Sequence, residues 1–326
     1  MRRSPRLSWL ALLLVALPAA AASGPWVETE QSKVRLVSRW SVAAPGDDAG
    51  LGIEFRLAPG WHVYWRNAGD AGYPPAVELE AGPLAGVELL YPAPQRFDLP
   101  GGLVAFGYER EVAYPLAARL DGDAGSPARL VLALDYLVCA EQCIPYDARL
   151  ELALPLAAAA AVDGETVALV DGWRERLPLP VGELAGGRAR GELRRASGPE
   201  LDLELALAAR GLAARAPDLF FAPHALVAIE RPAFRGDGRF LVHLRPLDET
   251  RTLPERLAFE WTATGFELDG SPLALAGTLE LARPSSSAAL GAPVRWLLAL
   301  GVVALVAFFL HRRNRRAAAA ESASST

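Results

Sequence analysis

The sequence predicts an all-β protein built from two tandem β-sandwich domains, with an apolar segment at each end. Short runs of alternating apolar and polar residues recur along the chain, as in half-buried strands. Turn residues drawn from 29 Gly and 26 Pro separate these runs. The length of 326 residues suits about two domains.

The first predicted sandwich occupies residues 26–156. Its alternating runs are bounded by turns that contain Gly and Pro, and no long helical pattern interrupts them, which favours packed antiparallel sheets. The predicted strands cover residues 34–37, 51–57, 87–91, 129–134 and 149–154. All seven tyrosines lie between Tyr64 and Tyr146, so this region also differs in composition from the rest of the chain.

An alanine-rich stretch predicts a helical connector over residues 157–176, which Pro178 and Pro180 end. The connector and its linker together cover residues 157–182, and a flexible stretch extends over residues 182–198. The second β-rich domain occupies residues 183–283. Its predicted strands cover residues 201–205, 226–230, 239–244, 257–261 and 273–281.

The two ends predict targeting and membrane attachment. Residues 1–22 combine a basic start, a short apolar run and small residues, which is typical of a signal peptide; a membrane anchor is the alternative. Residues 288–310 predict one transmembrane helix, with a buried core helix as the alternative. Arginines concentrate in the tail over residues 311–326, which predicts a cytoplasmic C-terminus. The domains between the two ends are therefore expected to be translocated.

The predicted ectodomain is acidic. Without the eight arginines of the terminal segments, the 33 basic residues fall to 25, and without one glutamate the 38 acidic residues fall to 37. This balance disfavours binding of nucleic acid or anionic lipid along the ectodomain surface.

Two cysteines, Cys139 and Cys143, lie in the predicted translocated region, where disulfides form. Three intervening residues allow a disulfide if the segment turns. Such a short loop contributes little loop entropy to stability, whereas a strained or exposed bond exchanges readily. A structural disulfide, a redox-active pair and a metal site are the open interpretations, although two thiolates without a nearby histidine offer few ligands for zinc.

Two further segments are dense in aromatic and charged residues. One reads Gly-Trp-His-Val-Tyr-Trp-Arg-Asn-Ala-Gly-Asp over residues 60–70, and the other reads Phe-Gly-Tyr-Glu over residues 106–109. With Leu-Val-Cys-Ala-Glu-Gln-Cys-Ile-Pro over residues 137–145, they resemble the amino-terminal periplasmic domain of DsbD/ScsB-type thiol:disulfide interchange proteins. This resemblance covers residues 27–155, whereas residues 201–281 resemble the second part of ScsB-type ectodomains in pattern only.

The resemblance implies immunoglobulin-like sandwiches and a redox pair, Cys139 and Cys143, that cycles between disulfide and dithiol. Electrons would come from a membrane donor protein and pass to thioredoxin-like periplasmic proteins. The disulfide itself would be the redox group, so neither a bound cofactor nor a metal is expected.

The family's aromatic cap implies a shielded site in this chain. Tyr64 and either Phe106 or Tyr108 would shield the cysteines by analogy, with core packing as the alternative. His62 would act as a local base if the fold brings it near; a solvated or packed histidine is the alternative.

With one cysteine pair and one predicted span, the chain is expected to need a separate membrane reductase. The sequence thus predicts a periplasmic exchange protein anchored in the bacterial inner membrane, and leaves open whether it is an enzyme, a protein-disulfide reductase. The alternative is a non-enzymatic binding or assembly module with a structural disulfide, for example in cytochrome c or copper protein maturation. A remnant of a split gene is a third interpretation.

Overall fold

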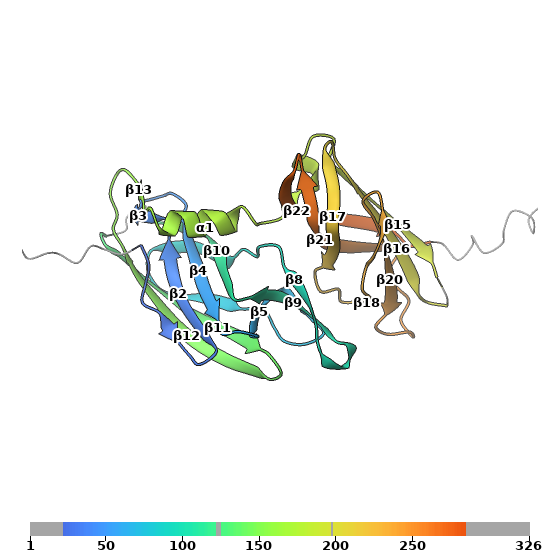
Figure 1. Cartoon of the computed structure of the whole chain (residues 1–326), viewed down its shortest axis with the longest axis horizontal. Coiled ribbons are helices and arrows are strands. Elements are labelled where there is room, and N and C mark those ends of the chain that lie inside the picture. Colours follow the sequence, from blue (N-terminus) through green and yellow to red (C-terminus); the bar gives the residue numbers. More distant parts are fainter. Residues whose placement is uncertain (1–21, 122–124, 197, 285–326) are drawn as a thin grey trace, which may run out of the picture.

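The computed structural model describes residues 22–121, 125–196 and 198–284, and most of them lie in β-strands (Figure 1). The all-β prediction is therefore confirmed. Residues 1–21 of the predicted signal peptide, the predicted span over 288–310 and the tail over 311–326 lie outside the described residues. Within the described ranges, no helix has both the length and the apolar character needed to cross a membrane.

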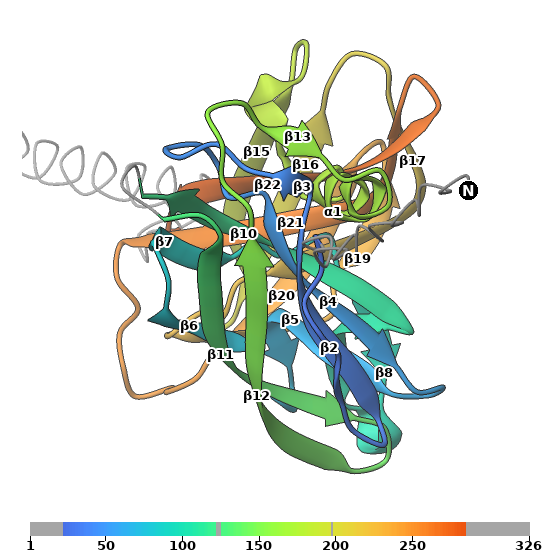
Figure 2. The ribbon, with the colours of Figure 1, turned by 90° about the vertical axis from the view of Figure 1, so that its left-hand side faces the viewer.

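Strands β1 to β12 form what we call the N-terminal unit, which contains two antiparallel sheets. The first sheet has the order β1 (Val27–Glu28), β2 (Ser32–Ser38), β4 (Leu51–Leu57), β10 (Glu111–Leu120), β7 (Leu84–Leu89). The second has the order β12 (Cys143–Leu154), β11 (Ala128–Cys139), β5 (His62–Gly69), β9 (Val104–Glu109), β8 (Gln95–Asp98), and β6 (Ala76–Ala81) also pairs with β11. Figure 2 shows β11 and β12 as a long ribbon that passes beside β2.

Both sheets contribute to one hydrophobic core. Leu36 and Phe55 come from the first sheet, while Trp65 and Tyr136 come from the second. The rings of Phe55 and Tyr136 meet edge to face with centroids 5.1 Å apart, a favourable aromatic geometry. The alternation of apolar residues in β4 and β11 thus places one face of each strand against the opposite sheet.

The connector differs from the helix predicted over residues 157–176. Strand β13 (Ala161–Val162) pairs with β3 (Trp40–Val42), and helix α1 covers only Thr166–Arg174. The helix begins late because Asp163 Oδ1 accepts hydrogen bonds from the backbone N–H groups of Glu165 and Thr166, which ends the preceding extended segment. Backbone pairing with β3 therefore outweighs the helix propensity of the alanines.

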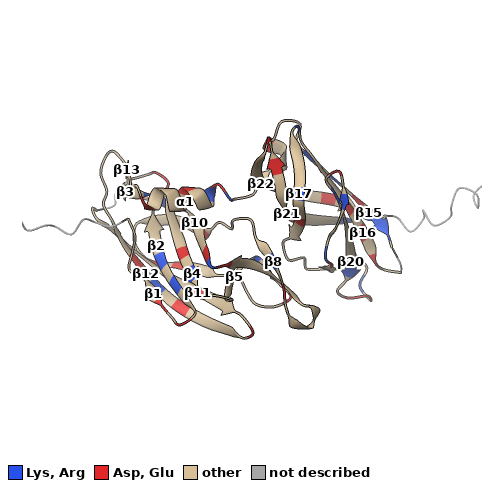
Figure 3. Cartoon of the chain, viewed as in Figure 1, with Lys and Arg blue, Asp and Glu red and all other residues tan. Residues whose placement is uncertain are grey.

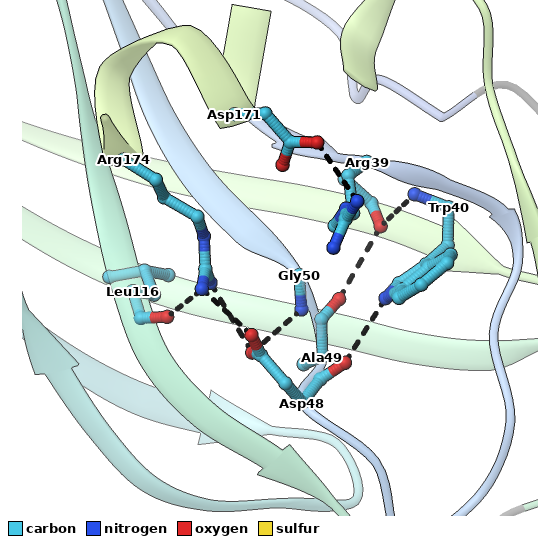
Figure 4. Close-up of polar contacts among 9 residues, drawn as sticks. Arg39, Trp40, Asp48, Ala49, Gly50, Leu116, Asp171 and Arg174 are labelled. Atoms are coloured by element: carbon cyan, nitrogen blue, oxygen red, sulfur yellow. Dashed lines mark hydrogen bonds and ion pairs between the residues drawn. The ribbon is translucent and has the colours of Figure 1, made fainter. Parts of the chain in front are cut away.

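Helix α1 is tied to the N-terminal unit by ion pairs (Figure 4). Arg39 Nη2 donates to Asp171 Oδ2 at 2.8 Å. Arg174 lies 2.8 Å from an Asp48 carboxylate oxygen and also donates to the Leu116 carbonyl. These groups are partly exposed, so they orient the helix more than they stabilise it.

Strands β14 to β22 form the C-terminal unit, which has a separate hydrophobic core. One sheet has the order β14 (Leu179–Pro180), β22 (Ser271–Ala282), β21 (Arg256–Leu268), β17 (Leu212–Phe221). The other has the order β15 (Arg188–Arg195), β16 (Leu201–Ala208), β20 (Arg239–Pro246), β18 (Val227–Ile229), and β19 (Ala233–Gly236) also pairs with β20. Figure 3 shows acidic and basic residues interspersed over both units.

The prediction of a flexible stretch over residues 182–198 is wrong for the central part of that stretch. Arg188–Arg195 form strand β15, which pairs with β16 along its whole length. Gly191 does not mark flexibility here, because a Cβ at that position would lie 2.9 Å from a methyl carbon of Leu279. The glycine instead permits close approach of the other sheet.

Candidate functional site

The two cysteines form a disulfide at the tip of the β11–β12 hairpin. Cys139 ends β11, Cys143 begins β12, and the two residues face each other in the register. Their α-carbons are 4.1 Å apart, so the three intervening residues do allow the bond. The backbone N–H of Ala140 donates to the Gln142 carbonyl at 3.1 Å and closes the turn.

The two sulfur-bearing residues differ in exposure. Cys139 is 1% exposed and belongs to a small apolar cluster. Cys143 is exposed to solvent. A thiolate from another protein can therefore approach Cys143, whereas Cys139 is shielded.

Strand β5 supplies the polar groups closest to the disulfide. His62 pairs with Cys139 in the register of β5 and β11. Tyr64 lies two residues further along β5, hence on the same face, and its hydroxyl oxygen is 3.7 Å from Cys143 Sγ. A disulfide sulfur carries no hydrogen, so the Tyr64 hydroxyl is the donor. The predicted residues His62 and Tyr64 are thus brought to the cysteines.

Phe97 and Leu99 cover the apolar side of the site. They pack against the cluster of buried residues formed by Tyr64, Ala68, Ala105, Leu137 and Cys139. The Phe97 ring stacks on the His62 imidazole with centroids 5.0 Å apart. The sequence-based prediction omitted Phe97, although the turn residues Pro100, Gly101 and Gly102 follow its strand and signal a strand end nearby.

Phe106 and Tyr108 lie on the opposite face of the sheet from the disulfide. Gly107 between them pairs with Tyr64, so both neighbours point the other way. The Tyr108 hydroxyl donates to the Pro92 carbonyl at 2.6 Å, and its ring meets Tyr114 in the main core. The structure therefore places these two aromatics in the core of the N-terminal unit.

Two glycines allow the aromatic packing around Tyr64. A Cβ on Gly107 would lie 2.0 Å from the Val63 carbonyl oxygen, so β5 and β9 approach as closely as they do only with glycine there. A Cβ on Gly72 would lie 2.2 Å from the Tyr64 ring, and its φ of +94° is also one that glycine adopts easily. Gly72 therefore allows the backbone just after the 60–70 segment to pack against the Tyr64 ring.

The two β5 side chains nearest the disulfide, His62 and Tyr64, are uncharged at neutral pH. Burial lowers the pKa of His62, and its Nε2 has no hydrogen-bond partner among the described residues. Burial raises the pKa of Tyr64 to about 12. Both rings are therefore neutral near pH 7. No group of three or more His, Cys, Asp or Glu side chains within the described ranges is arranged to hold a metal ion.

Residues 33–155 match the family model described as thiol:disulfide interchange protein DsbD, N-terminal. The resemblance to DsbD-type amino-terminal domains is therefore confirmed for this segment. The segment includes the disulfide, β5 and the Phe97 strand, so the DsbD-type match covers the whole site. A comparison with curated proteins finds no match.

Among solved structures, the chain is similar to the N-terminal periplasmic domain of ScsB from Proteus mirabilis. The TM-score is 0.61 at 18% sequence identity, over 81% of this chain and 100% of that chain. The similarity therefore extends beyond the DsbD-type segment into the C-terminal unit, where it concerns the fold.

Proposed function

We propose that the chain is a periplasmic thiol:disulfide exchange protein whose redox group is the Cys139–Cys143 disulfide. The observation that carries this proposal is the asymmetry of the disulfide, in which Cys143 is exposed, Cys139 is buried and an aromatic cover lies over the buried side. A disulfide that only stabilised a fold would gain little from so short a loop. The match of residues 33–155 to the DsbD amino-terminal family model supports the same conclusion.

The exchange begins when a partner thiolate attacks Cys143 Sγ. The Cys139–Cys143 bond breaks, its electron pair leaves on Cys139 as a thiolate, and a mixed disulfide joins Cys143 to the partner. The second cysteine of the same partner, as a thiolate, then attacks the partner sulfur of the mixed disulfide, and Cys143 leaves as a thiolate. The partner is now a disulfide and this chain has gained two electrons, which the reverse sequence delivers to an acceptor.

We further propose roles for the two β5 residues. Tyr64 donates a hydrogen bond to the sulfur at Cys143 and so stabilises charge that develops there during exchange. His62, neutral and unpaired at Nε2, lies opposite Cys139 in the register and is suited to donate a hydrogen bond to the Cys139 thiolate. Shielding from solvent is assigned to Phe97 and Leu99, with Tyr64 beneath them.

We also propose a cellular setting for the exchange. The chain would act as a protein-disulfide reductase between a membrane electron donor and thioredoxin-like periplasmic proteins, anchored by the predicted span over residues 288–310 with a cytoplasmic tail. Both units would be immunoglobulin-like sandwiches, with domain limits near residues 26–156 and 183–283. The redox group would be the disulfide alone, without a bound cofactor.

Trapping of a mixed disulfide tests the function. The Cys139→Ala variant leaves Cys143 as a free thiol. It should attack a thioredoxin-like protein that lacks its resolving cysteine and whose remaining cysteine carries thionitrobenzoate in a mixed disulfide, release the thionitrobenzoate and leave a disulfide-linked complex. The Cys143→Ala variant is the matched control and should trap little, because Cys139 is buried. If neither variant forms a complex, the exchange function is wrong and the binding-module interpretation with a structural disulfide takes its place.

A further inference from the structure

We propose that the C-terminal unit positions the cap of the redox site by holding strand β8 from the face opposite the disulfide. This inference rests on the proposed function in that it concerns the same site. It assigns a role to the C-terminal unit, and Asp218 becomes a positioning residue for exchange.

Neighbouring residues of β8 point to opposite faces of the sheet. Phe97 pairs with Ala105 and packs over the disulfide cluster. Arg96 pairs with Phe106 and points with it towards the C-terminal unit. Among the described residues β8 is an edge strand, and β9 is its one strand partner there. A group that fixes Arg96 therefore also fixes the backbone that carries Phe97.

Arg96 is fixed by a two-pronged ion pair. Its Nε and Nη2 donate to the two carboxylate oxygens of Asp218 at 2.8 and 2.9 Å, and Nη2 also donates to the Leu219 carbonyl at 3.0 Å. The Arg96 side chain is only 6% exposed, and its guanidinium lies over the rings of Phe106 and Phe220. Fork-shaped pairs of this kind set orientation as well as energy.

The C-terminal unit contacts the site strands at further points. Asp98, also on β8, pairs with Arg231 at 2.9 Å. On β5, Asn67 Nδ2 donates to the Phe221 carbonyl at 2.8 Å. Two of the strands that carry residues of the redox site, β5 and β8, are thus bonded to the C-terminal unit on the side away from the disulfide.

Strand β17 also supplies an apolar plug for this contact. Leu219 and Phe221 belong to the core of the C-terminal unit, whereas Phe220 between them belongs to the core of the N-terminal unit. Its ring meets Phe106 edge to face at 5.2 Å and Trp65 at 6.0 Å. The two units therefore share a packed junction directly behind the cap strand, so release of the junction should uncover the disulfide.

The experiment measures the rate at which dithiothreitol reduces the disulfide of the purified full-length chain. We expect Asp218→Asn to accelerate reduction about tenfold, which corresponds to a loss of ~1.4 kcal/mol in holding the cap. Phe97→Ala should accelerate reduction at least as much. If Asp218 acts through Phe97, adding Asp218→Asn to Phe97→Ala should cause no further acceleration, whereas general loosening of the fold would still add its own effect.

Glu267→Gln is the matched control, because it removes a carboxylate that pairs with Arg215 within the C-terminal unit at 2.7 Å. It should leave the reduction rate unchanged. A wild-type rate for Asp218→Asn, or a double variant that is reduced faster than Phe97→Ala alone, would overturn the proposal. Should Asp218→Asn fail to fold, Arg231→Ala decides: acceleration supports the proposal and a wild-type rate overturns it. A small thiol needs no protein partner, so this result is separable from failure of the exchange function.

Discussion

Replacing Phe220 with alanine should destabilise the N-terminal unit, although residue 220 belongs to the sequence of the C-terminal unit. Phe220 is 2% exposed, and its ring contacts Phe106 and Trp65 beneath the Arg96 guanidinium. Truncation would leave a cavity beside the Phe106 and Trp65 rings. The buried Arg96 guanidinium would also lose the Phe220 ring against which it packs and would be free to rearrange.

The expected loss is large for a single side chain. Deleting a fully buried phenylalanine side chain costs about 3–5 kcal/mol, because transfer and cavity terms add. Phe234→Ala is the matched control, since Phe234 is 37% exposed and packs on Phe240 within the C-terminal unit. Its expected cost is about 1 kcal/mol or less, in the range of partly exposed positions.

Urea unfolding, followed by both tryptophan fluorescence and far-UV circular dichroism, measures the two free energies. The two probes also reveal whether the units unfold together, which a shared junction predicts. If Phe220→Ala costs no more than Phe234→Ala, the ring does not belong to the N-terminal core and the reasoning about the junction fails.

Three further outcomes are expected. Gly107→Ala should reduce the free energy of unfolding by more than about 2 kcal/mol, because its Cβ would meet the Val63 carbonyl at 2.0 Å. In the same urea assay Gly172→Ala on α1 should be neutral or stabilising, because a Cβ there lies in open space. The lowered pKa of His62 means that the unfolded state binds more protons below the usual value of 6.5. Stability should therefore fall on acidification from about pH 7 to pH 5, and His62→Gln should lose less; equal losses would contradict this assignment. After reduction, Cys143 should react with iodoacetamide faster than the other cysteine in peptide mass analysis, and equal rates would contradict the exposure difference.

Much of the fold was predictable from alternation alone. Strand β4 has the bounds that the sequence predicts, Leu51–Leu57, and the predicted runs at residues 129–134 and 149–154 lie inside β11 and β12. Strand β5 was not predicted as a strand, because its first four residues do not alternate between apolar and polar types. The structure buries all four of them. Aromatic and turn residues instead made that segment conspicuous as a motif.

The cysteines, His62 and Tyr64 could be found as site candidates from motifs, but the cap could not. Choosing between Phe97 and Phe106 depends on which face of the sheet each occupies, and hence on register. Gly107 opposite Tyr64 sets that register, and no local pattern reveals the pairing. The ion pair between Arg96 and Asp218 joins residues more than a hundred positions apart, which only the tertiary structure brings together.

The equilibrium reduction potential of the Cys139–Cys143 bond tests the central claim most directly. It is measured by thiol alkylation of the purified protein across glutathione and dithiothreitol redox buffers. An exchange-active bond should have a potential above about −300 mV and should equilibrate with a thioredoxin-like protein. A potential below about −300 mV without such exchange would identify a structural disulfide and contradict the proposed function.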